Sequence, residues 1–381
     1  MTFDAGAADR LRAAFERNFH SGAEVGAALS VWQDCREVFS ACDGWKDAAR
    51  REPWTPETLV LIWSATKGLT SACVLCALDR AGRDLSSPVA DFWPEFAQNG
   101  KAQITVGKVV SHRAGLAALT DRTVGMLDHE SVARAIEKQA PLWENRDEHG
   151  YGPRTYGFIA DEIVRRLAGK SLGQYWREEF AEPMALDLWI GLPAEQHPRV
   201  AQMLAPRAGP ADDFSRALAV AGSLPNQAFS TPAGMLSPSA MNTPALRSAS
   251  LPSLGAIGSA TSLSKFYAVL AAGGEWEGRH YFSRRALDWM SMPLTQGPDK
   301  TLCTETAFSA GFMIDPVDWT SKKRALFGPS TRAFGHPGAG GSLAFADPDN
   351  HLGFAYVMNQ MEPGVLPKSR ALGLVQALYD Q

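Results

Sequence analysis

Hydrophobic residues recur with the period of a helix in some stretches of the chain and with that of a strand in others. The stretches 23–34 and 36–45, "AEVGAALSVWQD" and "REVFSACDGW", alternate like two strands of a hairpin. The short apolar run "TLVLIW", 58–63, also has strand character. Two helical stripes flank these strands, one formed by Leu11, Ala14, Phe15 and Phe19, the other by Leu69, Ala72, Cys73 and Cys76. The second helix is expected to end near Gly82.

Helical signals dominate from about residue 84 to residue 201, and strand signals return near the end of the chain. The stretch 342–360, "SLAFADPDNHLGFAYVMNQ", alternates around a Pro, Asp and Asn turn and predicts a second hairpin. A last helical stripe follows, formed by Ala371, Leu374, Val375 and Leu378. We therefore predict an α+β fold in which 1–83 and 255–381 build one sheet domain and 84–254 forms a helical insertion.

The segment 224–258 is rich in Pro, Ser and Ala and shows little periodicity. Long irregular segments in compact enzymes are usually walls or lids of a site, and a disordered linker is the alternative. We expect this segment to line a site between the two domains.

Charge and composition narrow the class of partner. The 381 residues carry a formal charge of −4 and no basic run, which argues against nucleic acid or an anionic membrane as a partner. The first 19 residues lack the basic and apolar regions of a secretory signal, and no run reaches the ~18 apolar residues of a membrane span. A cytoplasmic protein that acts on a small molecule is expected, and its oligomeric state is not predicted.

Cysteine and histidine spacing gives no support for a metal or a nucleotide cofactor. Cys73 and Cys76 both fall on a helical stripe, where core packing explains them better than redox chemistry does. The eight histidines include no H-E-x-x-H pair, and no G-x-G-x-x-G or P-loop pattern occurs. No cofactor and no metal are predicted.

The stretch "WSATKG", 63–68, places a serine one helical turn before a lysine. Residues i and i+3 share a helix face, so the Lys67 amine would lie beside the Ser64 hydroxyl. Unpaired N–H groups in the first turn would favour an oxyanion there. The pattern alone is weak, because S-x-x-K is expected about once by chance in such a chain. "SLSK", 262–265, matches equally well, but Ser262 is expected to be an exposed residue at the start of a helix.

Three stretches in order give the first S-x-x-K more weight: "SATK" at Ser64, "GYGPRTYGFIADEIVRRLAG" at Gly150 and "FGHPGAGGS" at Phe334. The arrangement resembles the serine beta-lactamase and penicillin-binding superfamily, most closely its class C-like branch of family VIII carboxylesterases and related acyltransferases. "VSHRAGL", 110–116, and 340–360 resemble that branch as well. The resemblance covers nearly the whole chain and implies a beta-lactamase-like fold, an antiparallel sheet flanked by helices with an all-helical insertion domain.

The resemblance also implies roles for individual residues. Ser64 would be the acylated nucleophile, and Lys67 and Tyr151 its proton-transfer partners, either of which could be the primary base. His336 and Gly338 would stand in the third motif, and the backbone N–H of Ala339 would complete an oxyanion hole with that of Ser64. Further candidates for pocket lining, each as easily core or loop, are Trp143, Met203, Asn242 and Phe334.

Two departures from the superfamily pattern bear on the substrate. Pro153 replaces the asparagine of the second motif, and His336 replaces the lysine of the third, which weakens the positive charge expected opposite a carboxylate. Both changes favour neutral esters over penicillins. The segment before Tyr151, "ENRDEHG", lacks the proline-glycine turn common in relatives, so a looser approach to Tyr151 is expected.

The sequence therefore predicts a serine hydrolase that cleaves small carboxylic esters through an acyl-serine. An acyltransferase of the same fold is the first alternative, and weak beta-lactamase or D-amino-acid amidase activity is another. A non-catalytic descendant that binds a ligand in the old pocket is the alternative from a different class.

Overall fold

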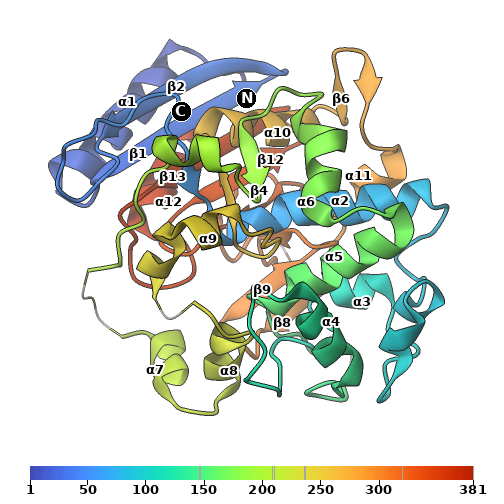
Figure 1. Ribbon diagram of the computed structural model, residues 1–381. Coiled ribbons are helices and arrows are strands. Elements are labelled where there is room, and N and C mark those ends of the chain that lie inside the picture. The colour runs from blue at the N-terminus through green and yellow to red at the C-terminus, as the bar shows by residue number, and fades with distance from the viewer. Residues whose placement is uncertain (146, 208, 210, 236, 320, 381) are drawn as a thin grey trace.

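The computed structural model describes residues 1–145, 147–207, 209, 211–235, 237–319 and 321–380. Its largest element is an eight-stranded antiparallel sheet (Figure 1). In spatial order the strands are β2 (Arg36–Gly44), β1 (Gly26–Gln33), β13 (Leu352–Met358), β12 (Leu343–Asp347), β11 (Phe334–Pro337), β10 (Met313–Ile314), β9 (Glu305–Phe308) and β8 (Thr295–Pro298). Both predicted hairpins are present, and β1 pairs with β13, so segments from both ends of the chain build one sheet.

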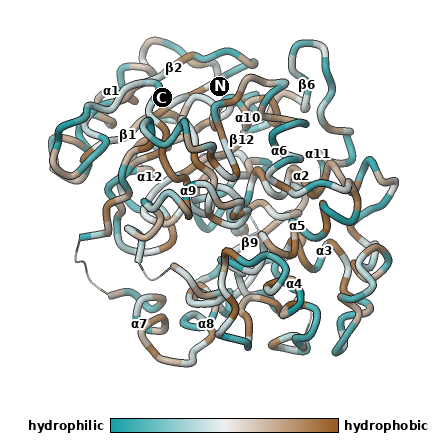
Figure 2. Tube along the Cα trace, in the orientation of Figure 1, coloured by the Kyte–Doolittle hydropathy of each residue, from teal (hydrophilic) through white to brown (hydrophobic). Residues whose placement is uncertain are grey.

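Helices cover both faces of this sheet because its central strands are apolar on both sides. On β13, Phe354 and Tyr356 belong to the core formed with α1 (Ala5–His20) and α12 (Ser369–Tyr379). The alternate residues Ala355 and Val357 face the core that contains α10 (Ala260–Ala271). The hydropathy colouring shows the same arrangement, with hydrophobic stretches in the interior and hydrophilic turns at the periphery (Figure 2).

Helix α2 (Thr66–Arg80) runs through the interior between the sheet and the other helices. Its residues from Thr66 to Leu78 are buried, including Cys73 and Cys76, which are free thiols packed in the core. A Cβ atom at Gly68 would lie 2.0 Å from the Tyr267 hydroxyl of α10, so only glycine allows this close packing. Gly82, with φ +68°, follows the helix where a stop was predicted.

The segment 84–254 is mainly helical. It contains η2 (Val89–Asp91), η3 (Pro94–Ala97), α3 (Val106–Val110), α4 (His129–Lys138), α5 (Thr155–Ala168), α6 (Leu172–Trp176), the π-helical turn η4 (Arg177–Ala181), η5 (Ala194–Arg199), α7 (Asp213–Ala219), α8 (Leu224–Ser230), η6 (Pro238–Asn242) and α9 (Pro244–Ser248). The all-helical prediction needs one correction, since strand β4 (Leu188–Ile190) pairs with β5 (Ala256–Gly258), which also pairs with β3 (Val60–Leu61). This small sheet joins the two predicted domains.

Two further local predictions differ from the structure. The segment 224–258 is more regular than predicted, since it contains α8, α9 and β5. Ser262 is buried rather than exposed, because its hydroxyl accepts a hydrogen bond from the Asp187 backbone N–H over 2.9 Å. Two short strands, β6 (Glu275–Trp276) and β7 (Arg279–His280), and helix α11 (Arg284–Ser291) complete the fold.

Candidate active site

Ser64 lies in the short turn η1 (Trp63–Ala65), where β3 passes into α2. The preceding residue, Trp63, has φ +51°, a left-handed conformation that is uncommon outside glycine. Thr66 holds this turn, because its hydroxyl donates to the Trp63 carbonyl oxygen over 2.5 Å and accepts from the Ala256 N–H over 2.9 Å. Trp63 and Ala65 are buried while Ser64 is partly exposed, so the turn presents the serine hydroxyl to the outside.

The Lys67 amine is fully buried and faces Ser64. Its Nζ atom is 3.5 Å from the Ser64 Oγ atom, and it donates to the carbonyl oxygens of Ser253 over 2.8 Å and of Pro153 over 3.1 Å. No carboxylate pairs with it in the described part of the chain. Burial therefore lowers the pKa of Lys67 well below its ordinary value. A neutral amine has two N–H groups, which the two carbonyls occupy, so its lone pair remains for the Ser64 hydroxyl.

The Tyr151 ring lies beside the Lys67 amine. The Lys67 Nζ atom is 4.7 Å from the centroid of the Tyr151 ring. The Phe308 ring stacks on the Tyr151 ring, with the two centroids 6.1 Å apart. Burial raises the pKa of Tyr151, and the nearby Ser64 hydroxyl lowers it by a smaller amount. Among the described residues the phenol oxygen has no hydrogen bond of ordinary geometry. Tyr151 is thus a neutral phenol beside Ser64, available as a donor and an acceptor.

His336 lies on β11 with its side chain fully buried. Its Nδ1–H group donates to the Pro337 carbonyl oxygen over 2.7 Å, which leaves Nε2 without a proton and without a partner among the described residues. Burial and the nearby Lys67 amine lower the pKa of His336 to about 3. The ring is therefore uncharged at neutral pH.

The loop after β11 approaches Ser64 closely. A Cβ atom at Gly338 would lie 2.3 Å from the Ile62 carbonyl oxygen, so glycine is required for this contact with the strand before Ser64. Pro337 has no N–H group. The N–H of Ala339 donates no hydrogen bond to any described residue, and Ala339 lines the same cavities as Ser64. The oxyanion hole formed by the Ser64 and Ala339 N–H groups stays a prediction.

Two cavities share Ser64, Phe229, Ala339 and Val365 in their walls. The smaller is a narrow cleft that also contacts Tyr151 and His336. The larger has a volume of about 400 Å³ and is mostly apolar. Its apolar walls come from Trp63, Phe214, Leu218, Phe229, Met235, Leu254, Met361 and Val365, and its polar lining includes Arg154, Ser215, Asn226, Ser230 and Ser237. Three of these residues, Phe229, Met235 and Leu254, belong to the segment predicted to be a site wall. A small apolar group attached to Ser64 would fit there.

The structure does not bring Trp143 or Asn242 to these cavities. The Asn242 side chain is engaged elsewhere, since it accepts from the Met203 N–H over 2.8 Å and donates to the Met203 carbonyl oxygen over 2.9 Å. The Trp143 ring lies against Gly150, and its Nε1–H donates to the Glu148 carbonyl oxygen over 3.3 Å. These two residues support loops near the site.

Sequence reasoning missed several groups that contact the site. The carbonyl acceptors of Lys67, on Pro153 and Ser253, carry no side-chain signal at all. His112 lies in "VSHRAGL", which was noted only as part of the resemblance, and its ring packs against Tyr151 with centroids 4.9 Å apart. Asp299, which accepts the Tyr151 backbone N–H over 3.1 Å, directly follows strand β8 and belongs to no recognisable motif.

Within the described ranges, no group of three His, Cys, Asp or Glu residues is arranged to hold a metal ion. No helix of the described chain combines the length and apolarity needed to cross a membrane.

Known proteins resemble this chain over nearly all its length. The profile of the Beta-lactamase family matches residues 11–378. "Esterase/beta-lactamase LipL" of Mycobacterium tuberculosis is 31% identical over 347 residues, which cover 88% of this chain and 77% of LipL. A penicillin-binding protein homologue from Caulobacter crescentus has a TM-score of 0.88 at 32% identity, covering 100% of this chain and 98% of that one. A family VIII carboxylesterase has a TM-score of 0.87, also at 32% identity, with the same coverage.

These matches agree with the antiparallel sheet and the flanking helices of this chain. The chain therefore belongs to the Beta-lactamase family, within the serine beta-lactamase and penicillin-binding superfamily, and has the fold of its esterase-type and beta-lactamase-type serine hydrolases.

Proposed function

We propose that this protein hydrolyses small, uncharged carboxylic esters through an acyl intermediate on Ser64. One observation carries the proposal: the buried Lys67 amine, whose two N–H groups are held by backbone carbonyls, faces the Ser64 hydroxyl at 3.5 Å. A serine hydroxyl becomes a good nucleophile only when a base takes its proton. Lys67 is thus the primary base in this proposal.

In the acylation step, the Ser64 oxygen attacks the ester carbonyl carbon while its proton passes to the Lys67 amine. The carbonyl oxygen becomes an oxyanion, and the free Ala339 N–H together with the Ser64 N–H would stabilise it. The carbon–oxygen bond to the alcohol then breaks. The leaving alcohol oxygen needs a proton, and Lys67 holds the one that it took from Ser64. Tyr151 relays this proton, because its neutral phenol can donate its own proton to the alcohol oxygen while it accepts the one from Lys67.

In the deacylation step, water attacks the acyl-serine carbonyl carbon. The same base accepts a proton from this water, the bond to Ser64 Oγ breaks, and the serine recovers its proton as the carboxylic acid departs. The two steps together consume one ester and one water and yield one acid and one alcohol.

The preference for uncharged esters rests on the third and second motifs. His336, with a pKa of about 3, carries no charge at neutral pH to pair with a substrate carboxylate. Pro153 has no polar side chain to contact an amide, and its carbonyl is engaged with Lys67. The apolar cavity of about 400 Å³ beside Ser64 supports a short or medium acyl chain. The esterase names of LipL and of the family VIII carboxylesterase support the same choice.

Labelling with a fluorophosphonate, combined with intact-protein and peptide mass spectrometry, tests the proposal. We expect one adduct on Ser64, no adduct in Ser64→Ala, and loss of p-nitrophenyl butyrate hydrolysis in the same variant. Ser262→Ala is the matched control, because Ser262 occupies the second S-x-x-K but is hydrogen-bonded to Asp187. A protein that neither labels nor hydrolyses a series of chromogenic esters would instead be a non-catalytic binding descendant.

The same assay with an added alcohol or amine acceptor separates hydrolysis from acyl transfer, since both share the acylation step. Transfer products that exceed the free acid would replace hydrolase with acyltransferase in the proposal. The cytoplasmic location inferred from the sequence stays a prediction.

A further inference from the structure

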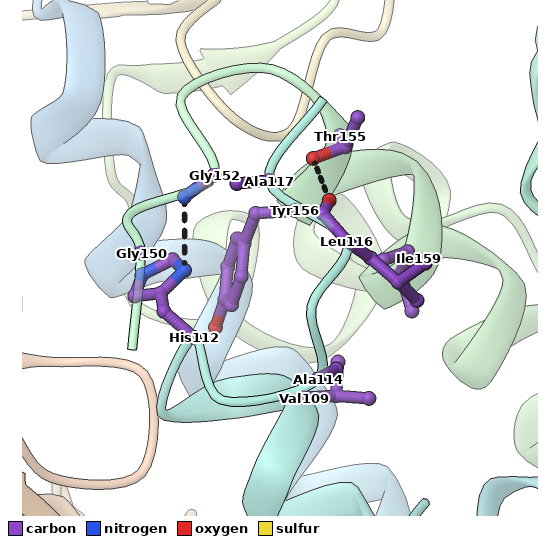
Figure 3. A pocket seen from close by; sticks show the side chains of 10 residues that line it. All are labelled: Val109, His112, Ala114, Leu116, Ala117, Gly150, Gly152, Thr155, Tyr156 and Ile159. Carbon is purple, nitrogen blue, oxygen red and sulfur yellow. Dashed lines mark hydrogen bonds between the residues drawn. The ribbon is translucent and has the colours of Figure 1, made fainter. Parts of the chain in front are cut away.

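The backbone around Tyr151 is held at three consecutive N–H groups. Gly150 donates to the His112 carbonyl oxygen over 3.1 Å, Tyr151 donates to the Asp299 Oδ1 atom over 3.1 Å, and Gly152 donates to the His112 Nδ1 atom over 3.2 Å. The bond between His112 and Gly152 is drawn in Figure 3, where the imidazole lies beside the loop that carries Gly150 and Gly152. The next residue, Pro153, has no N–H group.

On one side of the loop, the acceptor is a buried carboxylate. The Asp299 side chain has no exposed surface, and its Oδ1 atom also accepts the Thr301 and Leu302 N–H groups over 2.8 and 3.0 Å. Its Oδ2 atom accepts from the Thr306 hydroxyl over 3.0 Å, and that hydroxyl in turn accepts from the His149 ring over 2.8 Å. Each contact fixes the carboxylate further, so Oδ1 is held in place for Tyr151.

On the other side, His112 has an unusual backbone. Its φ is +60°, and its ring packs against Tyr151, Tyr156 and Phe308 with centroids 4.9, 5.0 and 4.7 Å away. Because Nδ1 accepts a hydrogen bond, the ring must be neutral, and burial lowers the pKa of His112 well below its ordinary value. The imidazole therefore serves as a fixed acceptor that is not lost to protonation at neutral pH.

We infer that His112 and Asp299 form a clamp that positions Tyr151 for proton transfer. The inference rests on the proposed role of Tyr151. Neither side chain has a hydrogen bond to Ser64 or Lys67 in the described chain, so each acts through the tyrosine loop. The looser approach to Tyr151 expected from the missing proline-glycine turn is not seen at residues 150–152, because two distant segments hold their N–H groups.

A double-mutant cycle separates positioning from a merely structural role. His112→Phe keeps a ring of similar size but removes the acceptor, and Asp299→Ala removes the carboxylate. We expect each to lower kcat for p-nitrophenyl butyrate about 10- to 100-fold with KM changed less than about threefold, since a 1 Å misplacement of a reacting group costs this much. In a Tyr151→Phe background the same substitutions should change kcat less than about threefold, because the group they position is gone.

Conservative variants supply the matched rescue. In His112→Asn, the amide oxygen takes the place of Nδ1, and asparagine tolerates a positive φ. In Asp299→Asn, one oxygen remains for the Tyr151 N–H. Both should retain at least about a third of the wild-type kcat, whereas the loss in His112→Phe and Asp299→Ala should coincide with faster amide exchange in a peptide that spans 150–152.

Two results would overturn the inference: equal losses with and without the Tyr151 phenol, or a folded His112→Phe or Asp299→Ala with wild-type kcat. Melting temperature and circular dichroism establish folding. Failure of the inference is distinct from failure of the proposed function, because the wild type would still hydrolyse esters and label at Ser64 if His112 and Asp299 did not position Tyr151. Loss of Ser64 labelling in the wild type would remove the function itself, and the inference with it.

Discussion

The amine of Lys67 donates a hydrogen bond to the backbone carbonyl oxygen of Ser253 over 2.8 Å, although 186 positions separate the two residues. This contact, together with the one to Pro153, fixes the base by means of groups that cannot ionise. A carboxylate in either place would keep the lysine protonated, whereas neutral carbonyls leave the effect of burial uncompensated. The orientation and the low pKa of Lys67 thus have a common origin.

Lys67→Met should lower kcat for a chromogenic ester by at least about 10³-fold, because the variant fills the same space but has no lone pair. Lys265→Met is the control, since this lysine belongs to the second S-x-x-K and donates to the Met184 carbonyl oxygen over 2.7 Å. Steady-state kinetics of both variants check the prediction. Equal activity of Lys67→Met and wild type would exclude Lys67 as the base.

The pH dependence of kcat/KM should show an acid limb that belongs to Lys67. Its free base is the active form, and its pKa is lowered, so activity falls as the pH drops through that pKa and stays level above it. His336 has a pKa of about 3 and cannot produce a limb between pH 5 and 8. We therefore expect His336→Gln to retain the limb, whatever its rate, and a variant that loses it would reassign the titration to the histidine.

Gly338→Ala should destabilise the protein by about 1–3 kcal/mol, because the new methyl group would overlap the Ile62 carbonyl. The catalytic activity should fall by more than the loss of folded protein explains, because the Ala339 N–H, a proposed donor to the oxyanion, would shift with the loop. Gly373→Ala in α12 is the matched glycine control: no atom lies within 4 Å of its added Cβ, and helix propensity predicts a gain of about 0.5–1 kcal/mol. Denaturant unfolding of both variants provides the comparison.

His336→Lys should restore a positive charge beside the cavity. We expect the ratio of kcat/KM for a carboxylate-bearing ester to that for its neutral analogue to rise about tenfold, which corresponds to about 1.4 kcal/mol of selective binding. The comparison uses two chromogenic esters that differ only in the carboxylate. An unchanged ratio would mean that the third motif does not face the substrate.

Patterns that depend on neighbours in sequence predicted the fold well. Alternation located β1, β2, β12 and β13, and the helical stripe after Ser64 matches α2. The resemblance placed Ser64, Lys67 and Tyr151 in one motif set, and the structure brings the three side chains together. Such signals are local or repeated along the chain, so they can be recognised from the sequence without knowledge of the structure.

Contacts between distant segments were not readable in the same way. Ser262 lies in the first turn of a helix, where a serine is usually exposed. It is buried here, and its hydroxyl accepts a hydrogen bond from the Asp187 backbone N–H. Asn242 has the polarity of a pocket residue, but the Met203 backbone occupies both ends of its amide. Asp299 was overlooked because its function depends on a backbone N–H of residue 151, and an N–H group is the same in almost every residue.

The pairing of β1 with β13 has a consequence for biosynthesis. A ribosome releases the hairpin of β1 and β2 early, but its inner edge finds a partner only after residue 358 has been translated. Throughout that interval, Leu29 and Val31 lack the cover that they have in the finished sheet. A nascent chain of this topology therefore depends on delayed collapse or on a chaperone, and stalled translation products should aggregate.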